Sequence, residues 1–280
     1  MSVSPASPAV DGIAFVGGGN MAVALIGGLR DAGVPAVALR AVEIQPEARA
    51  ALVQRFGVQA TADPAEVLPG ADVIVLAVKP QQLAAVCRSI APLVGQALVL
   101  SIAAGIRTAD IARWLGGHTR IVRAMPNTPA LVRAGITGVY AMPEVPAAQR
   151  AQAEGVLKAV GEVVWVADER AIDAVTAISG SGPAYVFHFM EGLIAAGEQL
   201  GLDPEAARRL TLQTVAGAAR LALDSPESPA LLRARVTSPN GTTQAALESF
   251  AASDLVGAIA RAVQAADRRA AELGDEFGKA

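Results

Sequence analysis

The chain has 280 residues, of which 52% are hydrophobic and 18% charged, and its formal net charge is −3. This length predicts one or two domains with a large apolar core. Lysine occurs only at positions 79, 158 and 279, and no basic stripe could follow a nucleic-acid backbone. No apolar run reaches the roughly 18 residues that a membrane-spanning helix needs. We therefore expect a soluble, cytoplasmic protein that binds neither nucleic acid nor membranes.

Cysteine and histidine are too few for a disulfide framework or a histidine-rich metal site. The single Cys87 lies in a helical pattern among apolar residues, which predicts a buried core side chain in a reducing compartment. With only His118 and His188 in the chain, no metal centre is expected. Residues 1–10 are rich in Ser, Pro and Ala, which predicts a disordered start.

A glycine-rich turn follows the first predicted strand. Ile13–Val16 is apolar and indicates a short buried strand, and Asn20–Leu29 has the amphipathic pattern of a helix. The spacing Gly17-x-Gly19-x-x-Ala22 between them is the dinucleotide-binding fingerprint, although a flexible loop or an ordinary turn is the alternative. The first glycine permits the tight turn, the second lets backbone approach a pyrophosphate, and the alanine keeps helix and strand close. The residues expected at the cofactor are Gly17, Gly18, Gly19, Asn20, Met21 and Ala22.

An acidic residue stands where this fingerprint expects one. A second strand is predicted at Ala36–Val42, and Glu43 follows it, roughly 20 residues beyond the glycines, where a carboxylate bonds the ribose 2′-hydroxyl. A carboxylate there repels a 2′-phosphate and favours NADH, but Arg40 or Arg49 could hold that phosphate instead. A solvated strand end is an equal interpretation of Glu43. The sequence therefore predicts NADPH or NADH as the cofactor without choosing between them.

Strands and helices alternate up to residue 167. Further strands are predicted at 71–78 and 97–102, from 121, and at 135–141 and 161–166, with helices at 47–56, 81–90, 108–115 and 147–160. This alternation predicts an α/β fold with a Rossmann-like, doubly wound parallel sheet over residues 11–167. Ligands of such sheets bind where strands end. The residues expected there are Ala77, Val78, Lys79 and Pro80 after one strand, and Ala103, Ala104 and Gly105 after the next. At this position Lys79 either faces the cofactor phosphates or is solvated.

Residues 168–280 are predicted to be helical throughout. A helix over Ala171–Leu200, interrupted at 179–183, is apolar around most of its circumference. At about 45 Å it is longer than one small domain can cover, so a second subunit is expected to pack against it. Further helices are predicted at 204–223 and 230–235 and over 244–273.

The loop Thr237–Thr243 is a second candidate site. Proline and Asn-Gly fix a turn, and two threonines then begin a helix near Thr243. Exposed N–H groups and hydroxyls at that position suit a small carboxylate, although a plain helix cap explains the same residues.

The scarcity of histidine and lysine argues against some classes of dehydrogenase. A dehydrogenase acting on an alcohol needs a base for the hydroxyl proton, usually histidine or lysine. Lys158 lies in a surface-type helix and His188 on an apolar helix face, so neither is well placed for that role. Reduction of a protonated C=N bond makes no such demand, because the substrate already carries its proton, and catalysis then needs chiefly positioning.

Six blocks in this order resemble the pyrroline-5-carboxylate reductase family. They are Phe15–Ala22, Ala77–Pro80, Ser101–Gly105, Arg123–Pro129, Ser179–Tyr185 and Ser238–Thr243. The resemblance covers essentially the whole chain from about Ile13.

The resemblance implies the last step of proline synthesis, reduction of Δ1-pyrroline-5-carboxylate to L-proline by NAD(P)H. It implies that the loop residues Ser238, Asn240, Gly241, Thr242 and Thr243 hold the substrate carboxylate, with Thr243 facing the imine nitrogen. Asn240 replaces the first glycine of that loop, and we expect the turn to survive because asparagine tolerates φ > 0. The resemblance also implies an all-α dimerisation domain over residues 168–280, a homodimer and a decamer of five dimers, with active sites shared across each dimer.

Two rival functions are considered, one another enzyme and one a protein without catalytic activity. A β-hydroxyacid dehydrogenase has a similar plan but needs a lysine on the long helix after the glycine pair, and the helix after Gly182 has none. A non-catalytic NAD(P) sensor is disfavoured by the intact Thr242-Thr243 pair. Reduction of a six-membered cyclic imine, the assembly beyond the dimer and feedback by proline stay open.

Overall fold

The computed structural model describes residues 12–279. The chain divides into two compact units. The first runs to Ser181 and takes in the chain from Ala266, and the second is Gly182–Ala265. This division differs from the predicted boundary at residue 168 because α6 (Ala171–Val175) packs on the strands Ile121–Met125 and Gly135–Ala141 of the first unit. The predicted disordered segment 1–10 lies outside the described residues.

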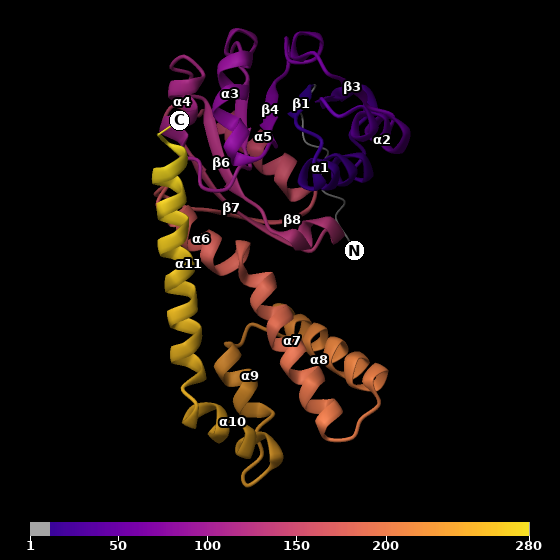
Figure 1. The fold of residues 1–280 in the computed structure, drawn as a ribbon, viewed down its shortest axis with the longest axis vertical. Helices are drawn as coiled ribbons and strands as arrows, with labels where there is room; N and C mark the ends of the chain where they lie inside the picture. The colour runs from indigo at the N-terminus through magenta and orange to yellow at the C-terminus, as the bar shows by residue number, and fades with distance from the viewer. Residues whose placement is uncertain (1–11, 280) are drawn as a thin grey trace. The chain divides into compact units, whose positions relative to one another are not determined.

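An eight-stranded sheet forms the centre of the first unit (Figure 1). Its strand order is β3-β2-β1-β4-β5-β6-β7-β8. The strands are β1 (Ile13–Val16), β2 (Leu39–Val42), β3 (Gln59–Thr61), β4 (Val73–Leu76), β5 (Leu98–Ser101), β6 (Ile121–Met125), β7 (Gly135–Ala141) and β8 (Gly161–Trp165). The chain runs from β1 outward to β3 and then crosses to β4 on the other side of β1. Doubly wound sheets bind their ligands at such a reversal of strand order.

One strand pair corrects the prediction of a fully parallel sheet. β7 is antiparallel to β6, with Val122 opposite Ala141, whereas the other neighbouring pairs are parallel. The chain between Met125 and Gly135 holds only a short 3₁₀ turn, Thr128–Val132. A parallel return needs a connection of about a dozen residues or more, so this short link forces the reversal.

Three further differences concern the limits of the strands. β3 lies at the sheet edge and was not predicted, because none of its three side chains is fully buried. Ala36–Ala38 forms a 3₁₀ turn before β2 instead of joining the strand. β4 is shorter than the predicted 71–78 because its ladder with β1 covers only Val73–Leu76.

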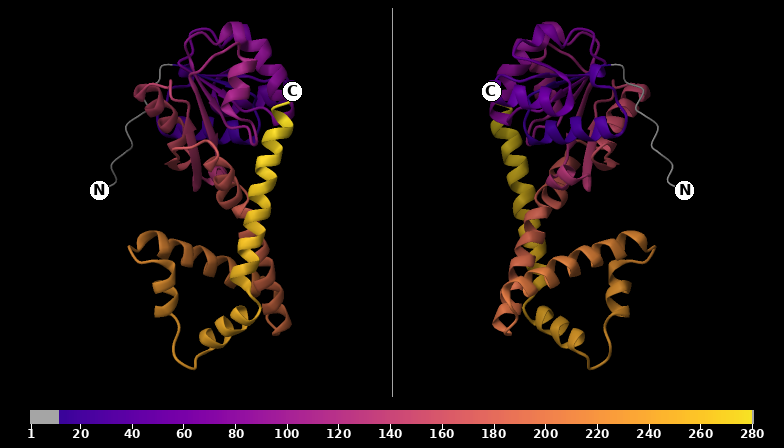
Figure 2. Two further views of the ribbon diagram at one scale, coloured as in Figure 1. Left: turned by 90° about the vertical axis from the view of Figure 1, so that its left-hand side faces the viewer. Right: turned by 90° about the vertical axis from the view of Figure 1, so that its right-hand side faces the viewer.

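Helices cover both faces of the sheet (Figure 2). They are α1 (Asn20–Asp31), α2 (Pro46–Phe56), α3 (Pro80–Ile90), α4 (Thr108–Trp114) and α5 (Ala147–Lys158). Alternate side chains of β1 enter different cores, because successive strand residues point to opposite faces. Phe15 belongs to the core that includes side chains of α1, α2 and α5, whereas Val16 belongs to the core that includes side chains of α3 and α4. Cys87 is fully buried in the second core, as predicted, and burial raises the pKa of its thiol to about 12.

The second unit consists of helices. They are α7 (Gly182–Gln199), α8 (Pro204–Asp224), α9 (Pro229–Arg235), α10 (Thr242–Ala252) and the beginning of α11 (Leu255–Phe277), whose later part belongs to the first unit. The predicted helix 171–200 is divided by a π-helical turn, Thr176–Gly180, in which the Ser181 N–H bonds the Thr176 carbonyl at 2.8 Å. No helix among residues 12–279 combines the length and apolar character needed to cross a bilayer.

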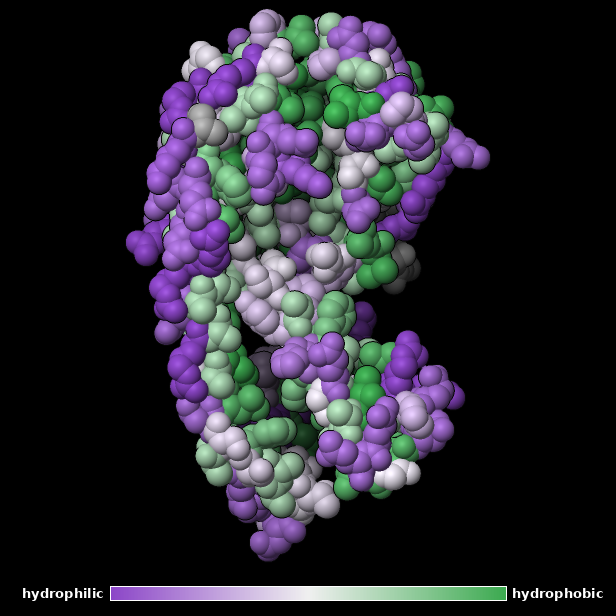
Figure 3. Space-filling model, viewed as in Figure 1, coloured by the Kyte–Doolittle hydropathy of each residue, from purple (hydrophilic) through white to green (hydrophobic). Residues whose placement is uncertain are grey.

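Large apolar side chains remain at the surface of this second unit (Figure 3). They include Phe187, Phe189, Leu210, Leu221, Phe250, Val256 and Ile259. The side chains of the unit that the structure shows as buried are small, Ala207 and Thr211, both on α8. This unit therefore does not enclose a large apolar core of its own within one chain.

Candidate active site

Gly17 begins a tight turn where β1, β2 and β4 end. Its N–H bonds the Val42 carbonyl at 2.9 Å, and its φ is +102°. A Cβ on this residue would lie 2.8 Å from the carbonyl oxygen of Ala77. Both the left-handed conformation and the close neighbour require glycine at this position. The turn therefore has the geometry that the sequence predicted.

Gly19 leaves open space over the beginning of α1. It is the N-cap residue, no side chain caps the helix there, and a Cβ on it would meet no atom within 4 Å. The first N–H groups of a helix lack intrahelical acceptors and lie at the positive end of its dipole. Ala22, one turn on, is fully buried against the sheet. The turn Gly17–Gly19 and the beginning of α1 accordingly fit the pyrophosphate of a dinucleotide.

The other two predicted cofactor segments differ in their surroundings. Lys79 is exposed and is the N-cap of α3, with Pro80 as the first helical residue. After β5, Ala103 is buried, Ala104 is half-buried and Gly105 has a φ of +71°.

The close neighbour of Gly105 is the end of α11, a contact that no local sequence pattern indicates. A Cβ on Gly105 would lie 3.2 Å from the Cβ of Leu273 and 3.3 Å from the ring of Phe277. The sequence predicts Gly105 at the cofactor, where ligands bind beyond the strand ends. Within the first unit its small size also lets the end of α11 pack against the segment that follows β5.

Glu43 is fixed at the end of β2. One carboxylate oxygen accepts a bond from the Gly18 N–H at 2.7 Å, and the other accepts from the Gln45 N–H at 2.8 Å. Nη1 of Arg49 donates to the main-chain carbonyl of Glu43 at 2.8 Å. Arg40 instead reaches the carbonyl of Pro69, at the opposite, amino end of the strands. Of the two arginines considered from the sequence, only Arg49 therefore lies near the glycine turn.

The structure has a buried ion-pair network around Arg123 that the sequence did not predict. Arg123 on β6 is 3% exposed and bonds Glu169 at 3.3 Å and Asp173 at 3.2 Å. Glu169 also accepts bonds from the N–H and hydroxyl of Thr108, at the beginning of α4. The signal in the sequence is a lone arginine inside the otherwise apolar strand 121–125. These bonds connect β6, α4 and the start of α6.

Asn127 holds the π-helical turn. Its Oδ1 accepts a bond from the Ile136 N–H at 3.0 Å, and its Nδ2 donates to the Ser179 carbonyl at 3.1 Å. A Cβ on the next residue, Gly180, would lie 2.6 Å from the terminal methyl of Met125. The Arg123–Pro129 block thus positions the segment 176–180 at the carboxyl edge of the sheet.

The loop Thr237–Thr243 has the predicted turn. Asn240 adopts a φ of +57°, which confirms that asparagine can replace glycine there. The Gly241 N–H bonds the Ser238 carbonyl at 3.0 Å, and the Asn240 N–H bonds Oε1 of Gln244 at 2.8 Å. α10 begins at Thr242, one residue before the predicted start, and Thr243 is half-buried in its first turn.

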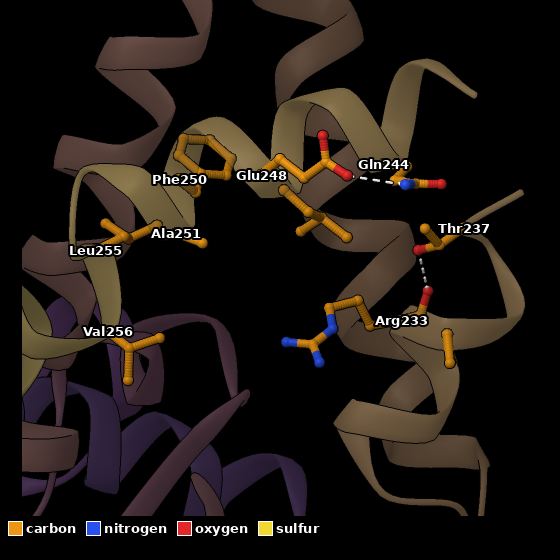
Figure 4. A pocket seen from close by; sticks show the side chains of 10 residues that line it. Arg233, Thr237, Gln244, Glu248, Phe250, Ala251, Leu255 and Val256 are labelled. Atoms are coloured by element: carbon orange, nitrogen blue, oxygen red, sulfur yellow. Dashed lines mark hydrogen bonds between the residues drawn. The ribbon is translucent and has the colours of Figure 1, made fainter. Parts of the chain in front are cut away.

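A pocket of about 610 Å³ adjoins this loop within the second unit (Figure 4). It is lined by α9, α10 and the beginning of α11, through Arg233, Ala234, Thr237, Gln244, Leu247, Glu248, Phe250, Ala251, Leu255 and Val256. The guanidinium of Arg233 points into the pocket, and Gln244 bonds Glu248 at 2.8 Å on its wall. Sequence reasoning did not single out Arg233.

Two family models match the chain. Residues 12–105 match a family described as NADP oxidoreductase, coenzyme F420-dependent. Residues 169–273 match the pyrroline-5-carboxylate reductase dimerisation family. The pyrroline-5-carboxylate reductase of Pseudomonas aeruginosa is 52% identical over 268 residues, 95% of this chain and 98% of the relative. The chain belongs to the pyrroline-5-carboxylate reductase family.

Other members of the family agree with this assignment. The reductase of Vibrio alginolyticus is 41% identical over 93% of this chain and 97% of the relative. The solved structure of the Coxiella burnetii reductase is 44% identical, with a TM-score of 0.91 over 94% of this chain and 98% of that one. A Plasmodium falciparum pyrroline carboxylate reductase with NADP bound is 28% identical, with a TM-score of 0.83 over 95% and 99% of the two chains. The dimerisation family indicates a homo-oligomer.

Proposed function

We propose that this chain reduces Δ1-pyrroline-5-carboxylate to L-proline with NADPH or NADH as hydride donor. The observation that carries the proposal is the 52% identity to a pyrroline-5-carboxylate reductase over nearly the whole of both chains. The open glycine turn at the beginning of α1 supports it independently, because it fits the pyrophosphate of the required cofactor.

Residues of the first unit hold the nucleotide. The N–H groups that begin α1, at Asn20, Met21 and Ala22, bind the pyrophosphate, and Gly17, Gly18 and Gly19 form the turn that lets it approach. The segments Ala77–Pro80 and Ala103–Gly105 extend this surface along the carboxyl edge of the sheet. When bound, the cofactor supplies a hydride from its nicotinamide ring.

Residues of the loop before α10 hold the substrate. The Ser238 hydroxyl and the N–H groups that begin α10, at Thr242 and Thr243, suit a carboxylate, which also gains from the positive end of the α10 dipole. Asn240 and Gly241 form the turn before them, and their N–H groups are already bonded within the chain. The Thr243 hydroxyl aligns the ring nitrogen. Because the protonated imine already carries its proton, addition of a hydride to the C=N carbon completes the amine without a further proton step. These residues therefore act chiefly by positioning.

Assembly and location complete the proposal. The apolar surface of α7, α8 and α10 supports a dimer formed through the helical unit, Gly182–Ala265. We infer that five such dimers form a decamer, that each active site is shared across a dimer, and that the enzyme acts in the cytoplasm.

The test is the rate of NADH and NADPH oxidation, followed at the nicotinamide absorbance, with pyrroline-5-carboxylate as substrate. We expect turnover, and we expect Thr243→Ala to lower kcat by about tenfold or more while nucleotide affinity stays unchanged, since only imine alignment is lost. Ser249→Ala, which removes an exposed hydroxyl from the same helix, is the matched control and should retain wild-type turnover. No turnover by a folded, nucleotide-binding protein would contradict the proposal.

A further inference from the structure

The Glu43 carboxylate is directed at the glycine turn and not into solvent. Its two oxygens accept bonds from the N–H groups of Gly18 and Gln45 at 2.7 and 2.8 Å. A Cβ on Gly18 would lie 2.9 Å from the nearer of these oxygens, so the carboxylate lies directly against the turn. The side chain is half-buried. These contacts fix one charged group beside the position where the fold admits a pyrophosphate.

The hydrogen-bonding chemistry of this group selects among ribose substituents. An ionised carboxylate has only acceptor sites, and each oxygen can accept more than one hydrogen bond. After the two main-chain bonds, acceptor capacity remains for a hydroxyl donor such as the ribose 2′-OH of NADH. A 2′-phosphate carries about −1.5 to −2 charge and offers mainly acceptors, so it meets Glu43 with like charge and without a donor.

The two arginines near Glu43 in the sequence both donate to main-chain carbonyls. Arg40 reaches toward Pro69 at the opposite end of the strands. Nη1 of Arg49 is bonded to the main-chain carbonyl of Glu43 at 2.8 Å and lies 3.4 Å from that of Ile44, so this nitrogen is directed at the backbone. Glu47, in the first turn of α2, adds a second negative charge close to the end of β2.

We propose that Glu43 sets the cofactor selectivity of this chain and makes NADH the preferred nucleotide. The proposal rests on the proposed function, because it assumes that a dinucleotide occupies the glycine turn. Glu43 accepts the ribose 2′-hydroxyl of NADH and repels the 2′-phosphate of NADPH. The bond from Gly18 keeps the carboxylate in place before the nucleotide arrives.

The experiment measures binding alone, with no pyrroline substrate present. The purified chain is titrated with NADH and with NADPH, and nicotinamide fluorescence gives each Kd. We expect the Kd for NADH to be lower by about tenfold or more, which corresponds to one hydrogen bond to a charged group. Glu43→Gln should reduce the ratio of the two Kd values by about tenfold. Glu162→Gln changes the net charge equally, on the strand at the far edge of the sheet, and should leave the ratio unchanged.

Each contrary outcome has a distinct meaning. A wild-type chain that binds NADPH as tightly as NADH overturns the proposal. This comparison needs no variant, so it remains decisive even if the Glu43→Gln protein folds poorly. Equal effects of Glu43→Gln and Glu162→Gln also overturn it, since net charge alone would then act. A selective loss of NADPH binding in Arg49→Gln, with NADPH preferred in wild type, assigns the phosphate to Arg49. Binding of neither nucleotide contradicts the proposed function itself.

Discussion

The first unit (the sheet unit) and the second unit, Gly182–Ala265 (the helical unit), differ most in how far they bury their large apolar side chains. In the sheet unit, Ile13, Phe15 and Ile74 are fully buried between the sheet and the helices on its two faces. In the helical unit, Phe187 is 59% exposed and Leu210 is 57% exposed. Burying such a side chain contributes about 1.5–3 kcal/mol, so each one left at the surface withholds that stabilisation.

The difference shows which part of the chain can fold on its own contacts. The sheet unit buries most of its large apolar residues in two cores of its own, whereas the helical unit leaves its large apolar residues at the surface. The match of residues 169–273 to a dimerisation family gives the partner of this surface as another copy of the chain. We therefore expect substitutions in the sheet unit to act mainly on its stability. Substitutions on the exposed apolar face of the helical unit should act mainly on self-association.

The largest expected effect comes from the buried ion pairs of the sheet unit. Arg123→Leu leaves the carboxylates of Glu169 and Asp173 without their cation and should lower the free energy of unfolding by about 3–5 kcal/mol. Urea unfolding followed by tryptophan fluorescence measures it, because Trp114 and Trp165 both lie in this unit. Arg261→Leu, which breaks an exposed ion pair with Asp254 in the helical unit, should change it by less than about 1 kcal/mol. Similar losses in both variants would contradict the contrast.

The next effect concerns the exposed face of the helical unit. Phe187→Glu on α7 should weaken self-association by at least about thirtyfold, because a charge replaces an aromatic side chain in the interface. Sedimentation velocity over a concentration series measures the dissociation. Val37→Glu places the same charge on an 87% exposed position of the sheet unit and serves as the control. If Phe187→Glu assembles like the control, α7 does not lie in the interface.

A smaller effect is expected at the glycine turn. Gly19→Ala should weaken nucleotide binding about tenfold, since its methyl enters the space left for the pyrophosphate, while thermal stability changes little. Gly17→Ala should instead lower the melting temperature, because its methyl would lie 2.8 Å from the Ala77 carbonyl at a positive φ. Wild-type nucleotide affinity in Gly19→Ala would show that the pyrophosphate does not bind over Gly19.

The smallest effect is a pH dependence in the sheet unit. Burial lowers the pKa of His118 below its usual 6.5. The unfolded chain then binds more protons, so the stability that depends on neutral His118 is complete above pH 6.5 and falls as the pH drops below it. Urea midpoints at pH 7.5 and pH 5 should differ less in His118→Gln than in wild type. An unchanged difference would remove His118 as the source.

The sequence allowed the centre of the sheet unit to be predicted because its signals are local. A buried strand, a glycine turn and a helix follow one another within Ile13–Asp31, and the structure has them there. The positive φ of Asn240 was predictable for the same reason, since asparagine tolerates that conformation. The reversal of β7 was also within reach, because the link from Met125 is too short for a parallel return.

Other features depend on contacts between residues far apart in the chain. Gly105 faces Leu273 and Phe277, and no local pattern indicates that pairing. Arg123 could be seen as an unusual residue in a strand, but its partners, Glu169 and Asp173, lie about fifty residues away. The edge strand β3 has no fully buried side chain and therefore carries no hydrophobic pattern.

Hydrogen exchange on wild type and Phe187→Glu, at one protein concentration, tests the central contrast most directly. We predict that amides of β1, β4 and β5 keep the same protection in both proteins, whereas amides of α7 and α8 lose protection when the assembly dissociates. Equal loss in the strands and the helices would contradict the account. So would wild-type protection of α7 and α8 in the dissociated protein, since the helical unit would then be stable without a partner.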